Sequence, residues 1–325
     1  TYRVKNGEAE IVAEKDGKPC CAVSPTPIGS ISIPSTLGGA RVTSIGQEAF
    51  RDCKELKMVT IPQSVTNIGV LAFYSCDIKS VNIPASVTSI GTQAFSDNSE
   101  LMSFSVEESN PSYSSRNGLL CTKDGATLIS GTSGDVEIPL SVTSIEGWAF
   151  TGRRKLTSVT IPPSVTNIGR TAFRWCSGLK SITIPPAVTR LDSNVFRDCN
   201  GLTSVVIPSN VTSIGYCAFC RCCGLTAVTI PASVTRIDSC AFWNCGSLVS
   251  VKIPASVMSI GKRAFNQCGS LVSVTMCGEC PTVPKAIFQG CPKLKSIHVP
   301  ANAKSWAGMK EWQGIPLVFD AEAKK

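Results

Sequence analysis

Long apolar segments and long basic segments are both missing from this sequence of 325 residues. No apolar run approaches the roughly 18 residues that are needed to cross a bilayer, so we expect no membrane-spanning segment. The net charge is +8, but Lys and Arg are scattered. A polyanion is therefore an allowed partner, while nucleic-acid binding is not expected. Charged residues make up 17% of the chain against 43% hydrophobic ones, which excludes a disordered protein.

A secretion signal is also missing from the start of the chain. The sequence opens at Thr1 without Met and shows no apolar h-region of a signal peptide. This start is typical of a trimmed mature fragment, so an export signal that was removed earlier stays open.

Histidine is scarce, because His298 is the single one in the sequence. A Cys–His dyad would need a cysteine of lowered pKa close to that ring. Cys277 and Cys280 lie about one repeat earlier in the sequence. However, His298 occupies a position where related segments carry an outward Ser or Thr. Asp192 and Asp238 are too far apart in the chain to form a carboxylate pair. We therefore predict no catalytic residues, no cofactor and no enzyme.

The most regular feature of the sequence is a repeat with a constant spacing of 23 residues. An Ile-Pro pair follows this spacing from Ile138-Pro139 to Ile253-Pro254. The phenylalanines that follow it are Phe150, Phe173, Phe196, Phe219, Phe242, Phe265 and Phe288. A fixed period of about 20–50 residues indicates a solenoid, in which each coil buries its apolar face against its neighbours. Such a fold spreads one surface along many coils and builds no single catalytic pocket.

Each repeat predicts a strand followed by tighter structure, as the segment from Leu179 to Leu202 shows. Ile182 and Ile184 alternate with polar residues, which predicts a half-buried strand that ends at Pro185. A short second strand and a glycine corner follow. In the next motif, Ala-Phe-x-x-Cys, the Phe and Cys lie at i and i+3 and predict one face of a helical turn. The expected fold class is therefore an α+β solenoid.

The domain prediction has a solenoid between two caps, because an open coil would expose a strand edge and a core. Residues 1–30 are predicted to form an N-terminal hairpin cap, since Asn6-Gly7 favours a tight turn. Residues 31–300 form about ten coils, and residues 301–325 form a C-terminal cap. One face of a short helix in that cap is predicted to hold Trp306, Met309 and Trp312.

An insertion at residues 107–137 interrupts the repeat. Within it, two short apolar runs, Gly118 to Cys121 and Ala126 to Ile129, flank Asp124-Gly125. This pattern predicts a β-hairpin. We expect the hairpin to project from the solenoid, where loops often carry function, and a hairpin that only lengthens the sheet is the alternative.

Cysteine is abundant, and its number, 17, is odd. Eight cysteines stand three residues after a repeat Phe: Cys53, Cys76, Cys176, Cys199, Cys222, Cys245, Cys268 and Cys291. This regular position predicts a ladder of small buried thiols. Cys217 and Cys240 share another repeat position and would form a disulfide if the protein is exported, because equivalent residues of adjacent coils lie within bonding range. Cys217-x-x-Cys220 also has zinc-like spacing, but we predict no metal site.

Two surfaces are candidates for binding. The outward strand positions form a small polar face: Ser158, Thr160, Ser181, Thr183, Ser204, Val206, Ala227, Thr229, Ser250, Lys252, Ser273 and Thr275. Variable positions around the Ala-Phe turns form an Arg/aromatic stripe: Trp148, Arg153, Arg154, Arg170, Arg174, Trp175, Arg197, Tyr216, Arg221, Trp243, Lys262 and Arg263. Arg and aromatic residues dominate binding hot spots, and Arg pairs bidentately with sulfate or carboxylate. The stripe is therefore the preferred prediction, although each surface could simply be solvated.

The unit Leu-x-x-Val-x-Ile-Pro-x-Ser-Val-Thr-x-Ile-Gly-x-x-Ala-Phe-x-x-Cys resembles the leucine-rich repeats of BspA-like proteins, also called the Treponema pallidum type. The resemblance covers about ten coils from Ile31 to Pro300, and Arg153 and Asn98 depart from it in the Cys position. It implies a right-handed leucine-rich-repeat coil and an extracellular or cell-surface protein that binds a host or microbial protein or a glycan. No catalytic residues carry over from that family. A structural spacer without a ligand, or a thiol or metal protein, is the alternative.

Overall fold

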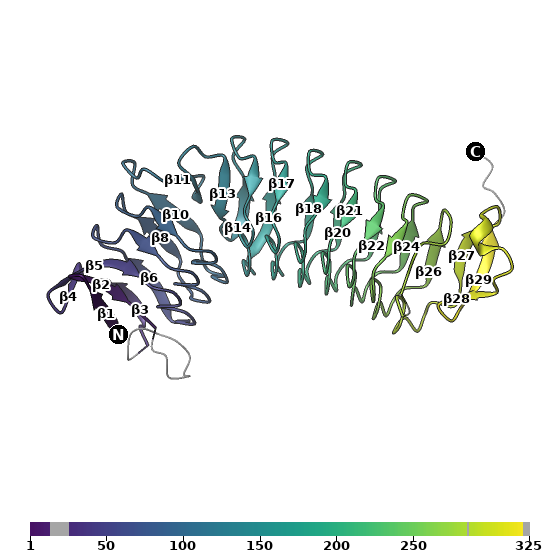
Figure 1. The fold of residues 1–325 in the computed structure, drawn as a ribbon, viewed down its shortest axis with the longest axis horizontal. Coiled ribbons are helices and arrows are strands. Elements are labelled where there is room, and N and C mark those ends of the chain that lie inside the picture. Colours follow the sequence, from purple (N-terminus) through teal and green to yellow (C-terminus); the bar gives the residue numbers. More distant parts are fainter. Residues whose placement is uncertain (14–25, 285, 321–325) are drawn as a thin grey trace. The chain divides into compact units, whose positions relative to one another are not determined.

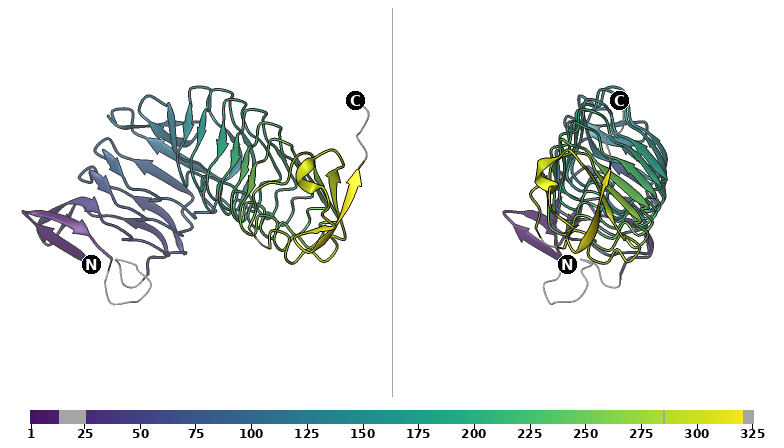
Figure 2. Two further views of the ribbon diagram at one scale, coloured as in Figure 1. Left: turned by 45° about the vertical axis from the view of Figure 1, so that its right-hand side comes forward. Right: turned by 90° about the vertical axis from the view of Figure 1, so that its right-hand side faces the viewer.

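The computed structural model describes residues 1–13, 26–284 and 286–320. It divides the chain into two compact units, an N-terminal unit of Thr1–Thr157 and a C-terminal unit of Ser158–Lys325. Residues 14–25 of the predicted N-terminal cap and 321–325 of the predicted C-terminal cap lie outside the described residues, and the predicted domain boundaries stay a prediction. In each unit successive turns stack on one another (Figures 1 and 2). The described residues form a right-handed β-solenoid of about 13 turns, where the repeat predicts about ten coils within residues 31–300.

In the N-terminal unit, a row of longer strands contains β3 (Gly29–Ser32), β6 (Leu56–Thr60), β8 (Ser80–Ile83), β10 (Ser103–Val106) and β14 (Gly134–Glu137). A row of mostly short strands contains β5 (Ala40–Ile45), β7 (Asn67–Ile68), β9 (Ser89–Ile90) and β15 (Ser144–Ile145). The other strands are β1 (Tyr2–Lys5), β2 (Glu8–Ile11), β4 (Thr36–Leu37), β11 (Tyr113–Arg116), β12 (Leu119–Thr122) and β13 (Thr127–Ser130). The boundary between the units falls within β16 (Leu156–Thr160).

In the C-terminal unit, the longer strands are β18 (Ser181–Thr183), β20 (Ser204–Val206), β22 (Ala227–Thr229), β24 (Ser250–Ile253), β26 (Ser273–Met276), β27 (Ile297–Pro300) and β29 (Ile315–Asp320). The short strands are β17 (Asn167–Ile168), β19 (Arg190–Leu191), β21 (Ser213–Ile214), β23 (Arg236–Ile237) and β25 (Ser259–Ile260). A 3₁₀ helix, η1 (Lys304–Trp306), and β28 (Glu311–Trp312) precede β29.

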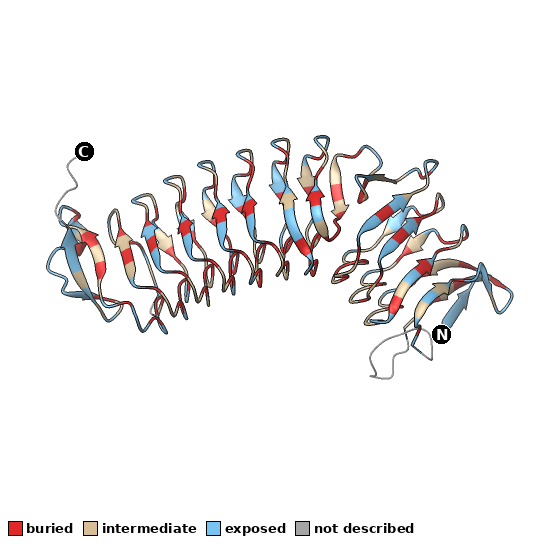
Figure 3. Ribbon diagram, turned by 180° about the vertical axis from the view of Figure 1, so that it is seen from behind, coloured by how far each residue is buried: buried red, intermediate tan, exposed pale blue. Residues whose placement is uncertain are grey.

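The repeat spacing sets the register of the parallel strands. In β18 and β20, Ile182 pairs with Val205, and both side chains are buried while their neighbours in the two strands are exposed. Buried and exposed residues alternate along the strands (Figure 3). This is the half-buried strand that the alternation of Ile with Ser and Thr predicts. The Asn6-Gly7 hairpin also forms, with β1 antiparallel to β2 and positive φ at both turn residues.

The segment around each repeat Phe is a left-handed turn and not the predicted helical turn, so the α+β prediction is wrong. The residues two before and two after Phe173, Thr171 and Trp175, have φ of 64° and 63°. A residue with positive φ cannot continue a right-handed helix, and two of them per turn exclude one. The backbone N–H of Phe173 instead donates to the carbonyl of Val195 on the next turn at 2.9 Å. The turns thus form a further ladder of hydrogen bonds between coils.

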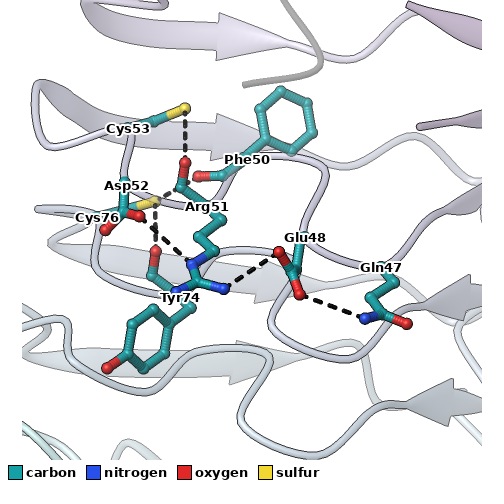
Figure 4. Close-up of polar contacts among 8 residues, drawn as sticks. All are labelled: Gln47, Glu48, Phe50, Arg51, Asp52, Cys53, Tyr74 and Cys76. Carbon is teal, nitrogen blue, oxygen red and sulfur yellow. Dashed lines mark hydrogen bonds and ion pairs between the residues drawn. The ribbon is translucent and has the colours of Figure 1, made fainter. Parts of the chain in front are cut away.

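A column of stacked phenylalanine rings fills the core beneath these turns. In the C-terminal unit, ring centroids from Phe173 to Phe288 are separated by 5.1 to 5.7 Å. In the N-terminal unit, Phe50 and Phe73 stack at 5.1 Å. The predicted ladder of buried cysteines lies beside this column, but Cys53 is disulfide-bonded and is not the free thiol that the repeat predicts. Cys76 donates its thiol to the carbonyl of Phe50 on the preceding turn at 3.0 Å (Figure 4).

The insertion forms the predicted hairpin but does not project from the solenoid. β12 pairs antiparallel with β13, and β11 adds antiparallel to the other edge of β12. Leu120, Cys121 and Leu128 are fully buried. The hairpin therefore lengthens the sheet and joins the core, because its apolar side chains find more contacts there than they would in a projecting loop.

The C-terminal tryptophans close the core without the predicted helix. Trp306 is fully buried and its indole N–H donates to the carbonyl of Gly278 at 2.8 Å. The rings of Trp306 and Trp312 meet edge to face at 5.3 Å, and Trp312 meets Phe288 at 6.1 Å. Met309, in contrast, is exposed. Only η1 is helical among the described residues of this segment, so the spacing of three reflects a turn followed by a strand.

Candidate functional site

The left-handed turns of the C-terminal unit present their outward side chains on one surface, which we call the turn face. The second residue after each Phe donates its backbone N–H to the first residue after the next Phe. Examples are Trp175 to Arg197 at 2.9 Å and Arg221 to Trp243 at 2.7 Å. This ladder places the side chains of consecutive turns side by side. Residues with the same place in the repeat are thereby collected into rows.

Three arginines of this face meet one carboxylate, and we call them together with Asp198 the Arg–Asp198 cluster. The Nε of Arg221 lies 2.9 Å from Oδ1 of Asp198, and the Nε of Arg197 lies 3.3 Å from Oδ2. The Nε of Arg174 lies 3.9 Å from the same Oδ2. The Asp198 side chain is only 9% exposed, whereas those of Arg174, Arg197 and Arg221 are 29%, 30% and 50% exposed. One nearly buried carboxylate therefore holds three partly exposed cations, which leaves an excess of positive charge.

Trp175 extends the cluster by stacking. The guanidinium carbon of Arg174 lies 3.9 Å from the centroid of the Trp175 ring, which is a close cation–π contact. The N-terminal unit repeats the theme at Arg51, which contacts Glu48 at 3.1 Å and Asp52 at 3.3 Å (Figure 4). Its guanidinium also lies 5.5 Å from the ring of Tyr74. Pairs of this kind hold an arginine in one orientation, so a ligand would meet a cation that is already ordered.

A group of thiols, the thiol cluster of Cys217, Cys220 and Cys240, lies beside these arginines. The Cys217 sulfur accepts hydrogen bonds from the Cys220 thiol and from the hydroxyl of Tyr216. The positive charge of Arg197 also stabilises the Cys217 thiolate. These contacts lower the pKa of Cys217 to about 6, against the opposing effect of burial. The same hydrogen bond raises the pKa of Cys220. Cys217 and Cys240 are not bonded to each other in the structure, and their predicted disulfide stays a prediction.

The structure does not bring all the predicted stripe residues together. Trp148, Arg153 and Arg154 belong to the N-terminal unit. Arg154 pairs with Asp97 at 2.7 Å, and Trp148 lines a cavity of about 60 Å³. In the C-terminal unit Arg170 is exposed, Tyr216 is 47% exposed, and Arg174, Trp175, Arg197, Arg221 and Trp243 all lie on the turn face.

Arg153 is a correction to the predicted stripe, because its side chain is completely buried and cannot meet a ligand. Its Nε donates to the carbonyl of Gly131 at 2.9 Å, and its Nη2 donates to the hydroxyl of Ser130 at 3.1 Å. It occupies the Cys position of its repeat, where a buried carbonyl needs a donor. Asn98, the other departure, acts in the same way and donates to the carbonyl of Phe73 at 2.8 Å.

Sequence reasoning missed a groove of about 360 Å³ further along the turn face. We call it the amide groove, and its lining is Trp243, Asn244, Arg263, Asn266, Gln267 and Gln289. Four of these residues carry side-chain amides. These four amides are not part of the predicted Arg/aromatic stripe, although they occupy the same two positions after Phe as Arg174 and Trp175.

Other candidate chemistry finds less support. His298 lies 2.9 Å from Asp320 through Nδ1 and Oδ1, and no thiol contact to its ring is found among the described residues. No group of three or more His, Cys, Asp or Glu suited to a metal ion occurs in the described part of the chain. The same part contains no helix long and apolar enough to cross a membrane.

Comparison with known proteins agrees with the fold and the repeat. Residues 22–117, 131–248 and 217–308 match the BspA type leucine rich repeat region in six copies. The chain belongs to the BspA-type leucine-rich repeat family. No curated protein matches the chain.

Solved structures of leucine-rich repeat proteins are similar. A leucine rich cell surface protein from Faecalibacterium prausnitzii A2-165 is 31% identical with a TM-score of 0.55, covering 77% of this chain and 60% of its own. This chain thus spans less than two thirds of that protein. A leucine-rich repeat protein from Bacteroides ovatus ATCC 8483 is 25% identical with a TM-score of 0.50, and 94% of each chain is covered. One from Eubacterium ventriosum ATCC 27560, at 21% identity, a TM-score of 0.55 and coverage of 89% and 91%, shares the fold.

Proposed function

We propose that this chain is a non-enzymatic binding module that holds a protein or glycan on its turn face, mainly through the Arg–Asp198 cluster and Trp175. The observation that carries the proposal is the meeting of three guanidinium groups from successive turns at one nearly buried carboxylate. The three guanidinium groups exceed the charge of Asp198 by two and are partly exposed, which suits the sulfates or carboxylates of a partner.

The proposal places the protein at the cell surface or outside the cell. The Faecalibacterium relative is described as a cell surface protein, which supports this location. Adhesion to a host or microbial partner is the role that fits a surface protein whose repeats present the same positions many times. A partner that spans several turns would add small contacts along the face, so loss of one turn should weaken binding gradually.

A binding panel tests the proposal. The purified chain and the variant Arg174→Ala/Trp175→Ala/Arg197→Ala are measured against matrix proteins, heparin and neutral glycans at low and high salt. The matched control is Arg190→Ala/Arg236→Ala, which removes two more exposed arginines from the short strands β19 and β23. We expect a ligand that the first variant loses and the control retains, with affinity that falls as salt rises.

Two results would overturn the proposal. If the unaltered chain binds nothing in the panel, the chain is better explained as a structural spacer. If it binds a ligand that the triple variant binds equally well, the Arg–Asp198 cluster is not the site.

A further inference from the structure

The amide groove lies on the turn face of the C-terminal unit and has its own internal order. The indole N–H of Trp243 donates to Oδ1 of Asn266 at 3.0 Å, and Nδ2 of Asn266 donates to Oε1 of Gln289 at 3.3 Å. Each hydrogen bond joins two successive turns. Asn266 is only 5% exposed, so this relay is partly shielded from water and fixes the plane of the Trp243 ring. Gln289 retains its amide N–H₂ group for an outside partner.

Gly290 makes room for a second amide in the groove. It has a φ of 78°, and a Cβ at this position would come within 2.6 Å of Nε2 of Gln267. A larger residue would therefore displace the Gln267 side chain. The backbone of Gln267 is tied to the same turn by its N–H, which donates to the carbonyl of Gln289 at 2.8 Å. No hydrogen bond to the Gln267 amide itself is found among the residues that the structure describes.

The lining of the groove selects a class of ligand. Arg263 is its only charged residue, and it contains no carboxylate and no aliphatic side chain, so neither a strong anion nor an apolar molecule is well matched. Side-chain amides both donate and accept hydrogen bonds, as do the hydroxyl groups of a sugar. The flat apolar ring of Trp243 suits the C–H face of a pyranose. The volume of about 360 Å³ lies at the small end of the range for ligand sites.

We propose that the amide groove binds a neutral sugar unit of a glycan, with Trp243 as the stacking platform and the amides of Gln267 and Gln289 on its hydroxyl groups. This site shares no residue with the Arg–Asp198 cluster. It gives the turn face a second specificity, for uncharged sugars, and does not depend on the proposed capture of anionic groups.

Titration calorimetry with neutral oligosaccharides tests the inference. The probes are short homo-oligomers of glucose, galactose, mannose and N-acetylglucosamine, measured with the unaltered chain, Trp243→Ala and Gln267→Ala/Gln289→Ala. Tyr2→Ala is the matched control, because it removes a partly exposed aromatic ring that belongs neither to the groove nor to the Arg–Asp198 cluster. We expect saturable binding of at least one probe, weakened roughly tenfold or more in both groove variants. The Tyr2→Ala control should bind as the unaltered chain does.

The outcomes separate this inference from the proposed function. Absence of saturable binding to every neutral probe would overturn it, and so would equal binding by the unaltered chain and both groove variants. Thermal unfolding of each variant shows whether it is folded, and Gln267→Ala/Gln289→Ala keeps the test valid if Trp243→Ala is not, because both glutamines are exposed. Heparin binding is measured in parallel. Its loss in the arginine variant, with sugar binding intact, would show that the two sites act separately.

Discussion

The sulfur of Cys199 lies 3.0 Å from the carbonyl oxygen of Phe173 on the preceding turn, and both residues are fully buried. The same contact joins Cys222 to Phe196 at 3.0 Å. The left-handed turn after each Phe directs that carbonyl inward, away from the backbone ladder. The Phe173 carbonyl also accepts the N–H of Cys176 at 3.2 Å, and the thiol of Cys199 fills its second acceptor position. The cysteine position therefore selects a small side chain that can donate a weak hydrogen bond.

Removing that donor should destabilise the fold. Cys199→Ala removes the thiol donor to the Phe173 carbonyl, which keeps the N–H of Cys176 at 3.2 Å, and is expected to lower the free energy of unfolding by about 1 kcal/mol. Cys199→Ser keeps a donor of similar size and should lose less. Chemical denaturation of the two variants measures the difference. Equal losses would mean that the position requires only volume.

Arg153 fills the same position with a larger donor. Arg153→Met keeps much of the volume but leaves the acceptors of Gly131 and Ser130 without partners. We expect a loss of unfolding free energy on the order of 3 kcal/mol. The control is Lys155→Met, because Lys155 is mostly exposed and its ion pair with Glu100 should contribute less than about 1 kcal/mol. Similar stabilities for the two variants in denaturant would contradict the structural role of Arg153.

Much of the fold could be predicted because every repeat has the same alternation of apolar and polar residues and the same spacing. The alternation around Ile182 predicts the strand, and the constant spacing predicts the column of rings that includes Phe196 and Phe219. The turn could not be predicted as left-handed, because Phe and Cys at i and i+3 suit a helix equally well. The conformation of the turn depends on the positive φ of residues such as Trp175 and Asp198. Hydrogen bonds between coils impose this φ, and they cannot be read from the spacing of Phe and Cys.

The candidate site was harder to predict than the fold. Arg174, Arg197 and Arg221 were recognised by residue type, but the carboxylate that gathers them, Asp198, was not. Arg153 has the same residue type and is buried, because its place in the repeat and not its charge decides where it lies. Residue type therefore indicates a binding role only when the position in the repeat is known to be exposed and not buried in the core.

The phenylalanine column can be tested at its centre. Phe219 stacks on Phe196 at 5.4 Å and on Phe242 at 5.2 Å, and it is fully buried. Phe219→Ala should cost about 3–5 kcal/mol of unfolding free energy. Phe219→Leu keeps most of the buried area and should cost less, and the loss that remains in this variant reports the ring stacking. Urea denaturation checks both, and a loss of under about 1 kcal/mol for Ala would contradict a continuous core.

The thiolate of Cys217 should make stability depend on pH. The folded pKa of about 6 lies below the ordinary value of 9.0, so the folded state favours the charged form. Its contribution is therefore complete above pH 9.0 and is lost as the pH falls toward 6. Cys217→Ser should lack this slope when unfolding is measured across that window. Cys220→Ala removes the main hydrogen-bond donor and should raise the Cys217 pKa, which ultraviolet absorbance of the thiolate detects. Identical pH profiles for the unaltered chain and Cys217→Ser would show that this thiol is neutral at pH 7.

Oxidation should link Cys217 to Cys240. Their backbones are adjacent, since the N–H of Cys217 donates at 3.1 Å to the carbonyl of Ser239, and equivalent residues of neighbouring turns lie within disulfide range. The Cys217 thiolate attacks oxidised glutathione and releases one glutathione thiolate. The Cys240 thiol then displaces the second, so two thiols lose two electrons and two protons to the reagent.

Peptide mapping by mass spectrometry identifies the bond, and we expect it to be absent in Cys240→Ser and present in the control Cys223→Ser. A bond from Cys217 to Cys220 instead would show that the neighbour in the same turn reacts first. That result would refute the pairing that the repeat register predicts.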